Sequence, residues 1–374
     1  MTSYDVAIIG AGIVGAACAA EAAREGLKVI VIDSQMIGGG ATAAGMGHIV
    51  VMDDSEAQFA LTRYSQILWN ELVDDLPADC EFETCGTMWV AADEEELDAV
   101  GHKSEFYESR GVEVEILDAE ALESAEPNLR EGLPGGLRVP GDSVLYPPCT
   151  AHFLAKQAQS HGADFHLGQA VVELTKEGVK LANGSFIAAG ITVNATGSWS
   201  PQLTLGLYVQ PRKGHLVITD RYPGFVHHQL IELGYLKSAH SFNADSVAFN
   251  IQPRKTGQLL IGSSRQYGAA DSEVDAQILN RMIERAREYM PRLGRLSAIR
   301  TWTGFRAATP DKLPLIGPCR VNDRVYLATG HEGLGITTSL GTAKLLVDQL
   351  TNRTPAIPIE PYLPSRFEAE RAYA

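Results

Sequence analysis

Three glycines near the N-terminus and one aspartate after them have the types and spacing of a nucleotide-binding turn. Gly10, Gly12 and Gly15 follow one apolar run, and Asp33 ends the next. In such a strand-turn-helix unit the first glycine permits the tight turn, the second lets the backbone approach a pyrophosphate, and the third lets the helix pack on the strand. The helix N-terminus then faces the phosphates. An acid at the position of Asp33 accepts hydrogen bonds from a ribose hydroxyl and would repel a 2′-phosphate, so the pattern predicts a dinucleotide with a free ribose.

The same glycine spacing also occurs in plain strand-to-helix turns that bind nothing. The flanking sequence favours a nucleotide site, because an apolar strand precedes Gly10, an alanine-rich helix follows it, and the acid comes close to the expected distance. A nicotinamide cofactor would satisfy this N-terminal unit taken alone, and an NAD(P)-dependent dehydrogenase is therefore the alternative interpretation of the unit.

Three further segments of small residues indicate that backbone approaches a ligand elsewhere. Residues 38–47 are too glycine-rich for a stable helix or strand. Two apolar strands end in Ala-Thr-Gly, at 195–197 and 328–330, and a glycine loop at 330–335 follows the second. A helix beginning near Gly335 would point unpaired amides at whatever occupies that loop. A nicotinamide enzyme gives no reason for the two later Ala-Thr-Gly segments.

The composition of the whole chain limits its class. The 374 residues are 45% apolar, which is enough for two domains with a sizeable core. The 31 basic and 46 acidic side chains, formally -15, disfavour a nucleic-acid or anionic-membrane role. Five cysteines without a CxxC pair indicate neither a disulfide framework nor a zinc site. With no leader pattern and no long apolar stretch, we predict a cytoplasmic protein that could reach a membrane only through a partner.

Hydrophobic periodicity predicts the elements that position these segments. Helices are expected at 55–76, 94–110, 149–161 and 273–290, and a strand at 81–91. Alternating residues between 206 and 300 predict an antiparallel sheet. The adjacent pair His227 and His228 would point to opposite faces of a strand, which disfavours a metal site, and no metal is predicted.

Taken in chain order, the segments resemble the D-amino-acid oxidase superfamily of flavoproteins. The resemblance rests on the glycine turn, the acid at 33, and the later segments 38–47, Asn194-Ala195-Thr196-Gly197-Ser198-Trp199-Ser200, Gly304-Phe305-Arg306, Thr309-Pro310-Asp311, Leu313-Pro314-Leu315-Ile316-Gly317 and 328–338. It spans nearly the whole chain and implies FAD. The chain looks most like the small amine-oxidising branch that includes glycine oxidase and the β subunit of sarcosine oxidase. Within that branch, 45–48 and 330–339 are most similar to D-hydroxyproline dehydrogenases.

The resemblance implies an α/β fold with two parts. One is a Rossmann-like FAD-binding domain of the glutathione-reductase type, and the other is an antiparallel β-sheet substrate domain with flanking helices. A cluster of prolines and glycines between 134 and 148 marks a crossing between lobes. We expect the FAD-binding domain to comprise 1–80, 142–205 and 301–374, and the substrate-binding domain to comprise 81–141 and 206–300.

In enzymes of this kind the substrate Cα hydrogen leaves as hydride to flavin N5, and the imine then hydrolyses or remains cyclic. The protein must orient Cα and hold the carboxylate, and the guanidinium of Arg306 suits the second task because it can bind a carboxylate through two hydrogen bonds. His48 and His331 lie on the two loops expected beside the flavin and complete the predicted catalytic set, although each could equally be a structural hydrogen-bond donor. Asn250 and Glu332 join these three in the predicted substrate-binding set.

The predicted FAD-binding residues lie in or near the glycine segments or the ends of expected strands, and most of them have small or apolar side chains. They are Gly10, Ala11, Gly12, Ile13, Val14, Gly15, Asp33, Ser34, Gly40, Ala41, Thr42, Met46, Gly47, His48, Val171, Val172, Ala195, Thr196, Gly197, Trp199, Gly330, Gly333, Leu334, Gly335, Ile336 and Thr337.

Three departures from the branch refine the expectation. Some oxidases attach FAD to a cysteine just before Thr-Pro-Asp, but residues 303–308 contain none, so we predict noncovalent FAD. The oxygen-activating lysine of sarcosine oxidases matches Leu260, which favours a dehydrogenase, although glycine oxidase also lacks that lysine. Asn250 stands where glycine oxidase-like members often have a tyrosine, and this suits a differently shaped substrate.

The leading hypothesis is oxidation of a secondary or D-amino acid, with cis-4-hydroxy-D-proline first. Glycine, sarcosine, an opine or L-proline are alternative substrates, and a β subunit or electron-relay subunit of a heteromeric dehydrogenase is an alternative of another class. The expected partners are an amino-acid substrate and an electron acceptor, which could be a quinone, a partner subunit or O2. Homo- or hetero-oligomers are both compatible with the sequence.

Overall fold

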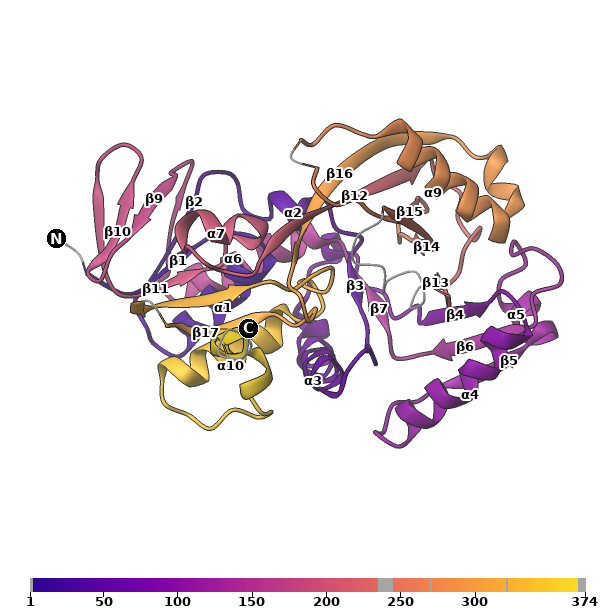
Figure 1. Cartoon of the computed structure of the whole chain (residues 1–374), viewed down its shortest axis with the longest axis horizontal. Helices are drawn as coiled ribbons and strands as arrows, with labels where there is room; N and C mark the ends of the chain where they lie inside the picture. The colour runs from indigo at the N-terminus through magenta and orange to yellow at the C-terminus, as the bar shows by residue number, and fades with distance from the viewer. Residues whose placement is uncertain (1–2, 235–244, 270, 321, 369–374) are drawn as a thin grey trace.

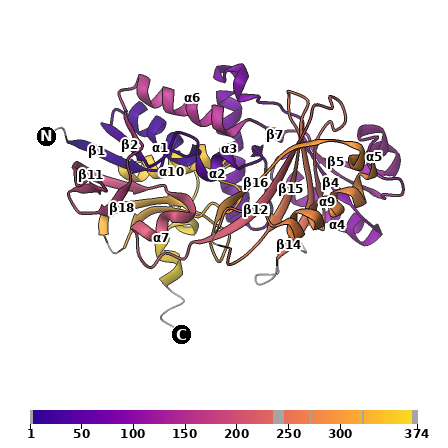
Figure 2. The same ribbon diagram turned by 90° about the horizontal axis from the view of Figure 1, so that it is seen from above.

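The computed structural model describes residues 3–234, 245–269, 271–320 and 322–368. Two sheets, each of eight strands, form two lobes (Figure 1). A two-stranded ribbon of β3 (His48–Ile49) and β7 (Ser143–Val144) lies between the lobes. The view turned by 90° shows the same two lobes side by side (Figure 2). This mixed α/β architecture confirms the predicted fold class.

The first lobe contains the glycine turn in a mainly parallel sheet. Its strands run in the order β17-β18-β11-β1-β2-β8, and β10 and β9 extend it beyond β11. Their bounds are β1 (Tyr4–Ile9), β2 (Val29–Asp33), β8 (Asp164–Leu167), β9 (Val171–Leu174), β10 (Gly178–Leu181), β11 (Phe186–Asn194), β17 (Leu315–Cys319) and β18 (Asn322–Thr329). Because β1, β2, β11 and β18 pair in parallel, their carboxyl ends meet at one edge of the sheet.

The second lobe is built on a sheet with the order β16-β12-β15-β14-β13-β4-β6-β5. The bounds are β4 (Thr87–Ala91), β5 (Glu115–Asp118), β6 (Gly135–Val139), β12 (Gln210–Thr219), β13 (Gln229–Glu232), β14 (Ser246–Pro253), β15 (Leu259–Arg265) and β16 (Ala298–Ala308). The strands that begin between residues 206 and 300 pair antiparallel with one another, as predicted, whereas β13 pairs in parallel with β4. The reason is topological, because these two strands come from segments far apart in the chain.

The helices predicted from periodicity are all present with shifted ends. The helix bounds are α1 (Ile13–Arg24), α2 (Gly40–Ala43), α3 (Glu56–Leu72), α4 (Glu94–Glu108), α5 (Ala119–Ala125), α6 (Pro147–Ser160), α7 (Ser200–Leu203), α9 (Ala276–Tyr289) and α10 (Ser339–Leu350). The short helices α5 and α7 were not predicted. α2 is a single turn in a segment expected to contain no helix. α10 begins at Ser339 rather than near Gly335, and the strand expected at 81–91 begins only at Thr87.

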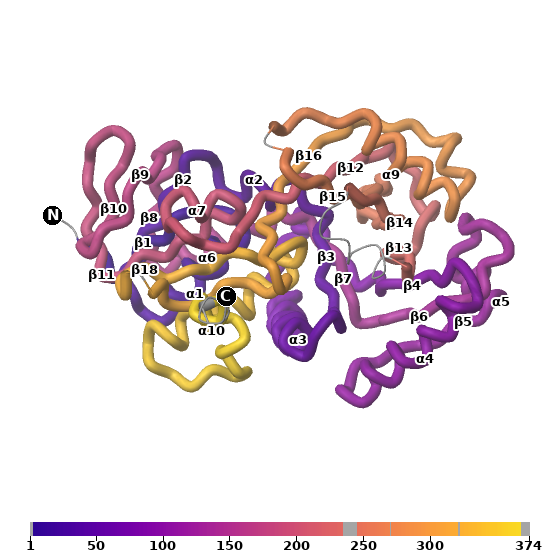
Figure 3. Tube along the Cα trace, viewed as in Figure 1, coloured from indigo at the N-terminus to yellow at the C-terminus, as the bar shows by residue number. Residues whose placement is uncertain are grey.

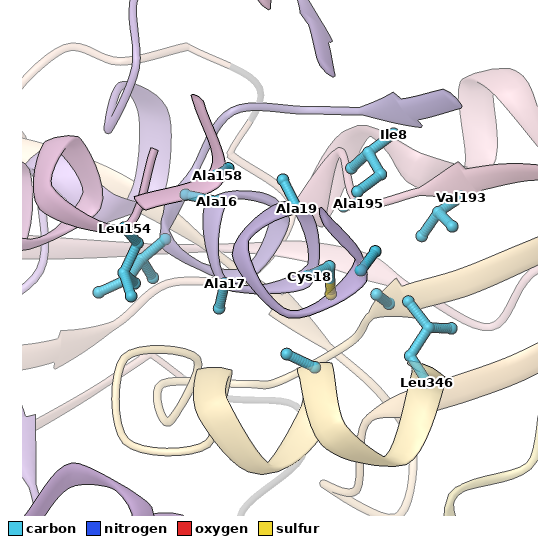
Figure 4. Packing of buried hydrophobic residues seen from close by; sticks show 14 of the residues in the cluster. Ile8, Ala16, Ala17, Cys18, Ala19, Leu154, Ala158, Val193, Ala195 and Leu346 are labelled. Carbon is cyan, nitrogen blue, oxygen red and sulfur yellow. The ribbon is translucent and has the colours of Figure 1, made fainter. Parts of the chain in front are cut away.

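Small side chains allow α1 to pack closely inside the first lobe. Ala16, Ala17, Cys18 and Ala19 are all buried in its main hydrophobic cluster. In Figure 4, Leu154 and Ala158 of α6 and Leu346 of α10 lie around this helix. The packing holds the N-terminus of α1, and with it the glycine turn, in a fixed position.

The chain passes between the lobes several times. The tube in Figure 3 begins in the first lobe, enters the second, and returns so that α10 lies beside α1. β16 runs through the domain boundary predicted at residue 301, and the division into domains stays a prediction. No helix among the described residues is long and apolar enough to cross a membrane.

Candidate active site

The glycine turn between β1 and α1 leaves no room for side chains. Gly10 has φ of 112°, and a Cβ there would lie 2.5 Å from the carbonyl oxygen of Ala195. A Cβ at Gly15 would lie 1.9 Å from the carbonyl oxygen of Gly10. Both contacts are with backbone that cannot move aside, so glycine is required at both positions. The turn thus brings the end of β11 against the N-terminus of α1.

Asp33 fixes the same turn from the end of β2. Its Oδ2 accepts a hydrogen bond from the amide of Ala11 at 2.6 Å, and its Oδ1 accepts one from the amide of Gln35 at 2.8 Å. A carboxylate has about four acceptor positions, so both oxygens keep capacity for further donors such as ribose hydroxyls.

The second glycine segment packs against the first. Thr42 Oγ1 accepts from the amide of Ile13 at 3.0 Å and thereby caps one free amide at the start of α1. A Cβ at Gly45 would lie 2.7 Å from Cδ1 of Ile336. The absence of a side chain at Gly45 therefore lets residues from both ends of the chain approach one another.

The late glycine loop is tied to the second lobe. The amide of Glu332 donates to the carbonyl oxygen of Ala307 on β16 at 2.9 Å, and Glu332 takes a left-handed φ of 55°. Thr337 Oγ1 donates to the carbonyl oxygen of His48 at 2.8 Å. These bonds join the loop to β16 and to β3, which lie on two sides of it.

A cavity of about 630 Å³ lies among these segments. It is of the size typical of ligand and cofactor sites. All five predicted substrate-site residues line it. The predicted FAD-binding residues that line it are Gly10, Gly12, Ile13, Val14, Asp33, Ser34, Gly40, Ala41, Thr42, Met46, Gly47, His48, Val171, Ala195, Thr196, Gly197, Trp199, Gly333, Leu334, Gly335 and Ile336. Ala11, Gly15, Val172, Gly330 and Thr337 do not line it.

The residues outside the cavity wall have other surroundings. Val172 is 52% exposed, because neighbouring residues of β9 point to opposite faces and Val171 takes the cavity side. Ala11 and Gly15 support the turn from behind, and Thr337 connects the late loop to β3. A direct contact of these residues with the cofactor stays a prediction.

Arg306 extends from β16 across β12. Its Nη1 donates to the carbonyl oxygen of Ser264 on β15 at 2.8 Å. Two glycines make the path possible, because a Cβ at Gly214 would lie 2.4 Å from Nη1 and a Cβ at Gly333 would lie 3.3 Å from Nε. The guanidinium is therefore held on a defined path in the cavity wall rather than on the surface.

The two predicted catalytic histidines are uncharged at neutral pH. Burial, with the charge of Arg306 as a second cause, lowers the pKa of His48 to about 4, while a contact with Gln252 acts in the opposite direction. Burial lowers the pKa of His331 to about 3, and its Nε2 lies 3.0 Å from Oγ1 of Thr342 on α10. One nitrogen of His331 is thus occupied by a structural partner, which limits its part in the site.

Sequence reasoning missed a second arginine in the cavity wall. Arg212 pairs with Arg306 across β12 and β16 and forms an ion pair with Glu332. Glu332 was expected to contact substrate, but its Oε1 is engaged by Arg212. No sequence pattern could reveal this pair, since it depends on the register between strands about ninety residues apart and on the fold of the late loop.

Comparison with known proteins gives this geometry a family. The family model described as DAO, FAD dependent oxidoreductase, matches residues 5–349. The chain belongs to the DAO family of FAD-dependent oxidoreductases. Its cofactor is FAD, and its relatives are amino-acid oxidases and dehydrogenases, which confirms the predicted family, cofactor and enzyme class.

Three individual likenesses cover most or all of the chain. Hydrogen cyanide synthase subunit HcnC of Pseudomonas aeruginosa is 27% identical over 99% of this chain and 98% of the relative. A D-amino acid dehydrogenase of Methylobacterium sp. is 30% identical over 75% of this chain and 67% of the relative. The crystal structure of glycine oxidase from Geobacillus kaustophilus superposes with a TM-score of 0.87 and 26% identity, covering 98% and 99% of the two chains.

The residues of the cavity fit FAD. The glycine turn leaves the N-terminus of α1 open to phosphates, and Asp33 stands at the end of β2 where a ribose binds in such units. The five cysteines, all within the described residues, are free, and none lines the cavity. Noncovalent FAD therefore stays the prediction for this DAO-family chain.

The adjacent histidines have an ordinary structural environment. His228 Nδ1 lies 2.8 Å from Oε1 of the buried Glu126, which also accepts from the amides of both His227 and His228. Among the residues that the structure describes, no group of three or more His, Cys, Asp or Glu side chains could hold a metal ion.

Proposed function

We propose that this chain oxidises a secondary or D-amino acid to its imine, with cis-4-hydroxy-D-proline as the first candidate substrate. The observation that carries the proposal is the guanidinium of Arg306 in the wall of the same cavity as the glycine segments. A guanidinium binds a carboxylate through two parallel hydrogen bonds, so Arg306 would hold the substrate carboxylate.

The chemistry divides between cofactor and protein. Bound FAD supplies the acceptor for the two electrons and the hydrogen that leave Cα. Arg306 would fix the carboxylate, and the uncharged His48 could accept a hydrogen bond from the substrate amine. A neutral imidazole at this position avoids adding a second positive charge beside an amine. The amine proton is released to solvent as the imine forms.

The dehydrogenase form of the proposal depends on Leu260. This side chain is buried and packs with Met46 and Leu216, both of which line the cavity. Leu260, an apolar residue, therefore stands at the position that matches the oxygen-activating lysine of sarcosine oxidases. The proposed electron acceptor is a quinone or a partner subunit, and O2 is the alternative. HcnC is named as a subunit and another relative as a dehydrogenase, and both names support a quinone or a partner subunit over O2 as the electron acceptor.

The hydroxylated substrate is proposed because the cavity carries an amide where a tyrosine would narrow it. Asn250 lies on β14, is buried, and lines the cavity. Glycine, sarcosine, an opine and L-proline remain the comparison substrates, and glycine has particular weight because a structural relative is a glycine oxidase.

Anaerobic titration of the FAD-loaded protein with D- and L-amino acids tests the proposal. We expect cis-4-hydroxy-D-proline to bleach the flavin absorbance faster than D-proline, glycine, sarcosine or L-proline. Bleaching by glycine alone would assign a glycine-oxidising enzyme. No bleaching by any amino acid without an added protein partner would favour the electron-relay subunit.

Two further measurements test the electron acceptor and the noncovalent attachment of FAD. In an oxygen electrode we expect little peroxide with substrate, and rapid production would reverse the assignment to the dehydrogenases. After acid precipitation we expect the yellow colour in the supernatant, whereas colour in the pellet would mean covalent FAD.

A further inference from the structure

One wall of the cavity carries buried polar side chains whose hydrogen bonds are incomplete. Gln229, Trp89, Asn250 and Gln58 are only 1%, 1%, 6% and 6% exposed, and all four line the cavity. Oε1 and Nε2 of Gln229, Nε1 of Trp89, Oδ1 of Asn250 and Oε1 of Gln58 have no hydrogen-bond partner within the described residues. Buried polar groups are nearly always paired, because an unpaired one keeps its full desolvation cost. Four around one cavity indicate that a ligand supplies the partners.

The strand register brings three of these side chains to one face of the second sheet. Trp89 on β4 pairs with Ile231 on β13, and Ile231 pairs in turn with Asn250 on β14. Gln229 precedes Ile231 by two residues, so it points to the same face. Gln58 comes from α3 and adds a fourth polar group from outside the sheet.

This polar face lies at a suitable separation from Arg306. The guanidinium of Arg306 is bonded to Ser264 on β15, which is the neighbour of β14, and β13 follows β14. Asn250 pairs with Gly262, two residues before Ser264 on β15. With neighbouring strands about 4.8 Å apart and a rise of about 3.3 Å per residue, the backbone of Asn250 lies roughly 8 Å from that of Ser264, and the backbone of Gln229, one strand further across and two residues further along, lies roughly 16 Å from it. A small ring held by its carboxylate at Arg306 would therefore point its far side toward Asn250, with Gln229 beyond Asn250 in the same direction.

We infer that Gln229, Asn250 and Trp89 form a specificity subsite for an uncharged hydroxyl on the substrate ring. The inference rests on the proposed function, since it takes the ring to be held at Arg306. A hydroxyl both donates and accepts, and so it can pair with an amide and an indole N–H together. None of the three side chains is charged, so a second carboxylate would find no compensating charge among them.

The decisive comparison uses two substrates that differ by one hydroxyl. With FAD-loaded protein, kcat/KM is measured for cis-4-hydroxy-D-proline and for D-proline, in wild type and in Gln229→Leu. We expect wild type to prefer the hydroxylated substrate by at least tenfold. Gln229→Leu should lower the ratio by about 10- to 100-fold, chiefly by slowing the hydroxylated substrate. The flavin content and spectrum should not change.

Two further variants separate the subsite from general damage. Gln66→Leu removes another buried glutamine, which bonds Asp142 outside the cavity, and it should leave the substrate ratio unchanged even if the protein is less stable. Asn250→Leu should also lower the ratio of kcat/KM for the hydroxylated substrate to that for D-proline. This second variant provides the test if Gln229→Leu does not fold. An equal loss for both substrates, or a loss of FAD in the subsite variants, would overturn the inference.

Binding of unreactive acids tests the subsite without turnover. Cyclopentanecarboxylate and cis-3-hydroxycyclopentanecarboxylate are titrated against the holoenzyme, and the flavin spectrum reports binding. We expect the hydroxy acid to bind at least tenfold more tightly, with the advantage lost in Gln229→Leu.

The outcomes distinguish the subsite from the proposed function. If no amino acid reduces the flavin but this binding pattern is seen, the proposed amino-acid oxidation is wrong and the hydroxyl subsite is supported. If D-proline and its hydroxy derivative react equally well, the subsite fails and amino-acid oxidation stands. Tighter binding of cis-1,3-cyclopentanedicarboxylate than of the hydroxy acid would also overturn the subsite.

Discussion

The nucleotide end of the cavity is made mostly of backbone, whereas the opposite end is made of side chains from one sheet. At the first end, Gly10 and Gly15 are required because backbone atoms occupy the space of a Cβ. At the other end, Arg306, Asn250 and Gln229 come from the three strands β16, β14 and β13. A backbone site depends on residues close in sequence, while a side-chain site depends on strand register. A single substitution at the nucleotide end should therefore disrupt the whole end and its FAD binding. A single substitution at the side-chain end should instead change substrate specificity or turnover while FAD stays bound.

The largest expected effect is at the backbone end. Gly15→Ala would force a Cβ against the carbonyl oxygen of Gly10, so we expect a loss of at least about 4 kcal/mol in the free energy of unfolding, together with loss of FAD. Thermal unfolding and the FAD retained after desalting measure it. Gly101→Ala in α4 is the matched control, because nothing lies within 4 Å of its Cβ position. If Gly15→Ala kept FAD and stability, backbone crowding would not govern this end.

The next effect sharpens the role of the side-chain end. Arg306→Met should lower kcat/KM by about 10³-fold, because it removes a charged anchor from a largely buried wall, while FAD remains bound. Steady-state kinetics and flavin absorbance measure the two outcomes. Arg300→Met, at an exposed position on the same strand, should be nearly neutral. Comparable loss in both variants would show that β16, rather than the guanidinium, is what matters.

The third effect concerns protonation near the middle of the cavity. The pKa of His331 falls from its ordinary 6.5 to about 3, so the unfolded chain binds a proton that the folded protein does not. The stabilisation is complete above pH 6.5 and is lost as the pH falls toward 3. At pH 4.5, His331→Asn should recover roughly 2–3 kcal/mol of the acid-induced loss, measured by urea unfolding with excess FAD. An identical pH dependence in wild type and variant would contradict the buried, neutral histidine.

The smallest effect returns to the nucleotide end. Asp33→Asn leaves one acceptor oxygen for the amides of Ala11 and Gln35, so one of the two hydrogen bonds is lost and the other loses its charge, and we expect the Kd of FAD to rise about tenfold. Asp5→Asn, where the exposed Asp5 accepts from the amide of Lys28 outside the cavity, should leave FAD affinity unchanged. Fluorescence titration of the apoprotein with FAD compares them. An unchanged Kd in Asp33→Asn would mean that the backbone alone determines FAD affinity.

The sequence predicted the backbone end well because its determinants are local. The strand, turn, helix and following acid lie within the first 33 residues, and the glycine spacing directly limits how they fold. The second glycine segment was recognised too, although its one-turn helix α2 was not, because Thr42 stabilises that turn through a bond to the distant Ile13. The predicted start of α10 was wrong by a few residues, since the preceding turn is bonded to β3 and to α3.

The side-chain end was predicted only in part. Arg306 could be chosen from its residue type, its setting between glycine and apolar residues and its place in the family resemblance, but its bond to Ser264 and its passage over Gly214 could not. The ion pair of Arg212 with Glu332 and the polar face around Gln229 were missed altogether. A buried glutamine looks the same in sequence as an exposed one.

By itself, the sequence determined that a dinucleotide binds near the N-terminus and that the chain resembles flavin-dependent amine oxidoreductases, because local spacing and glycine conformation carry that information. Only the tertiary structure decided which polar groups meet around the substrate space. Strands from residues 87 to 308 are brought side by side by pairing that no local pattern encodes, and burial then decides which histidines are uncharged and which amides lack partners.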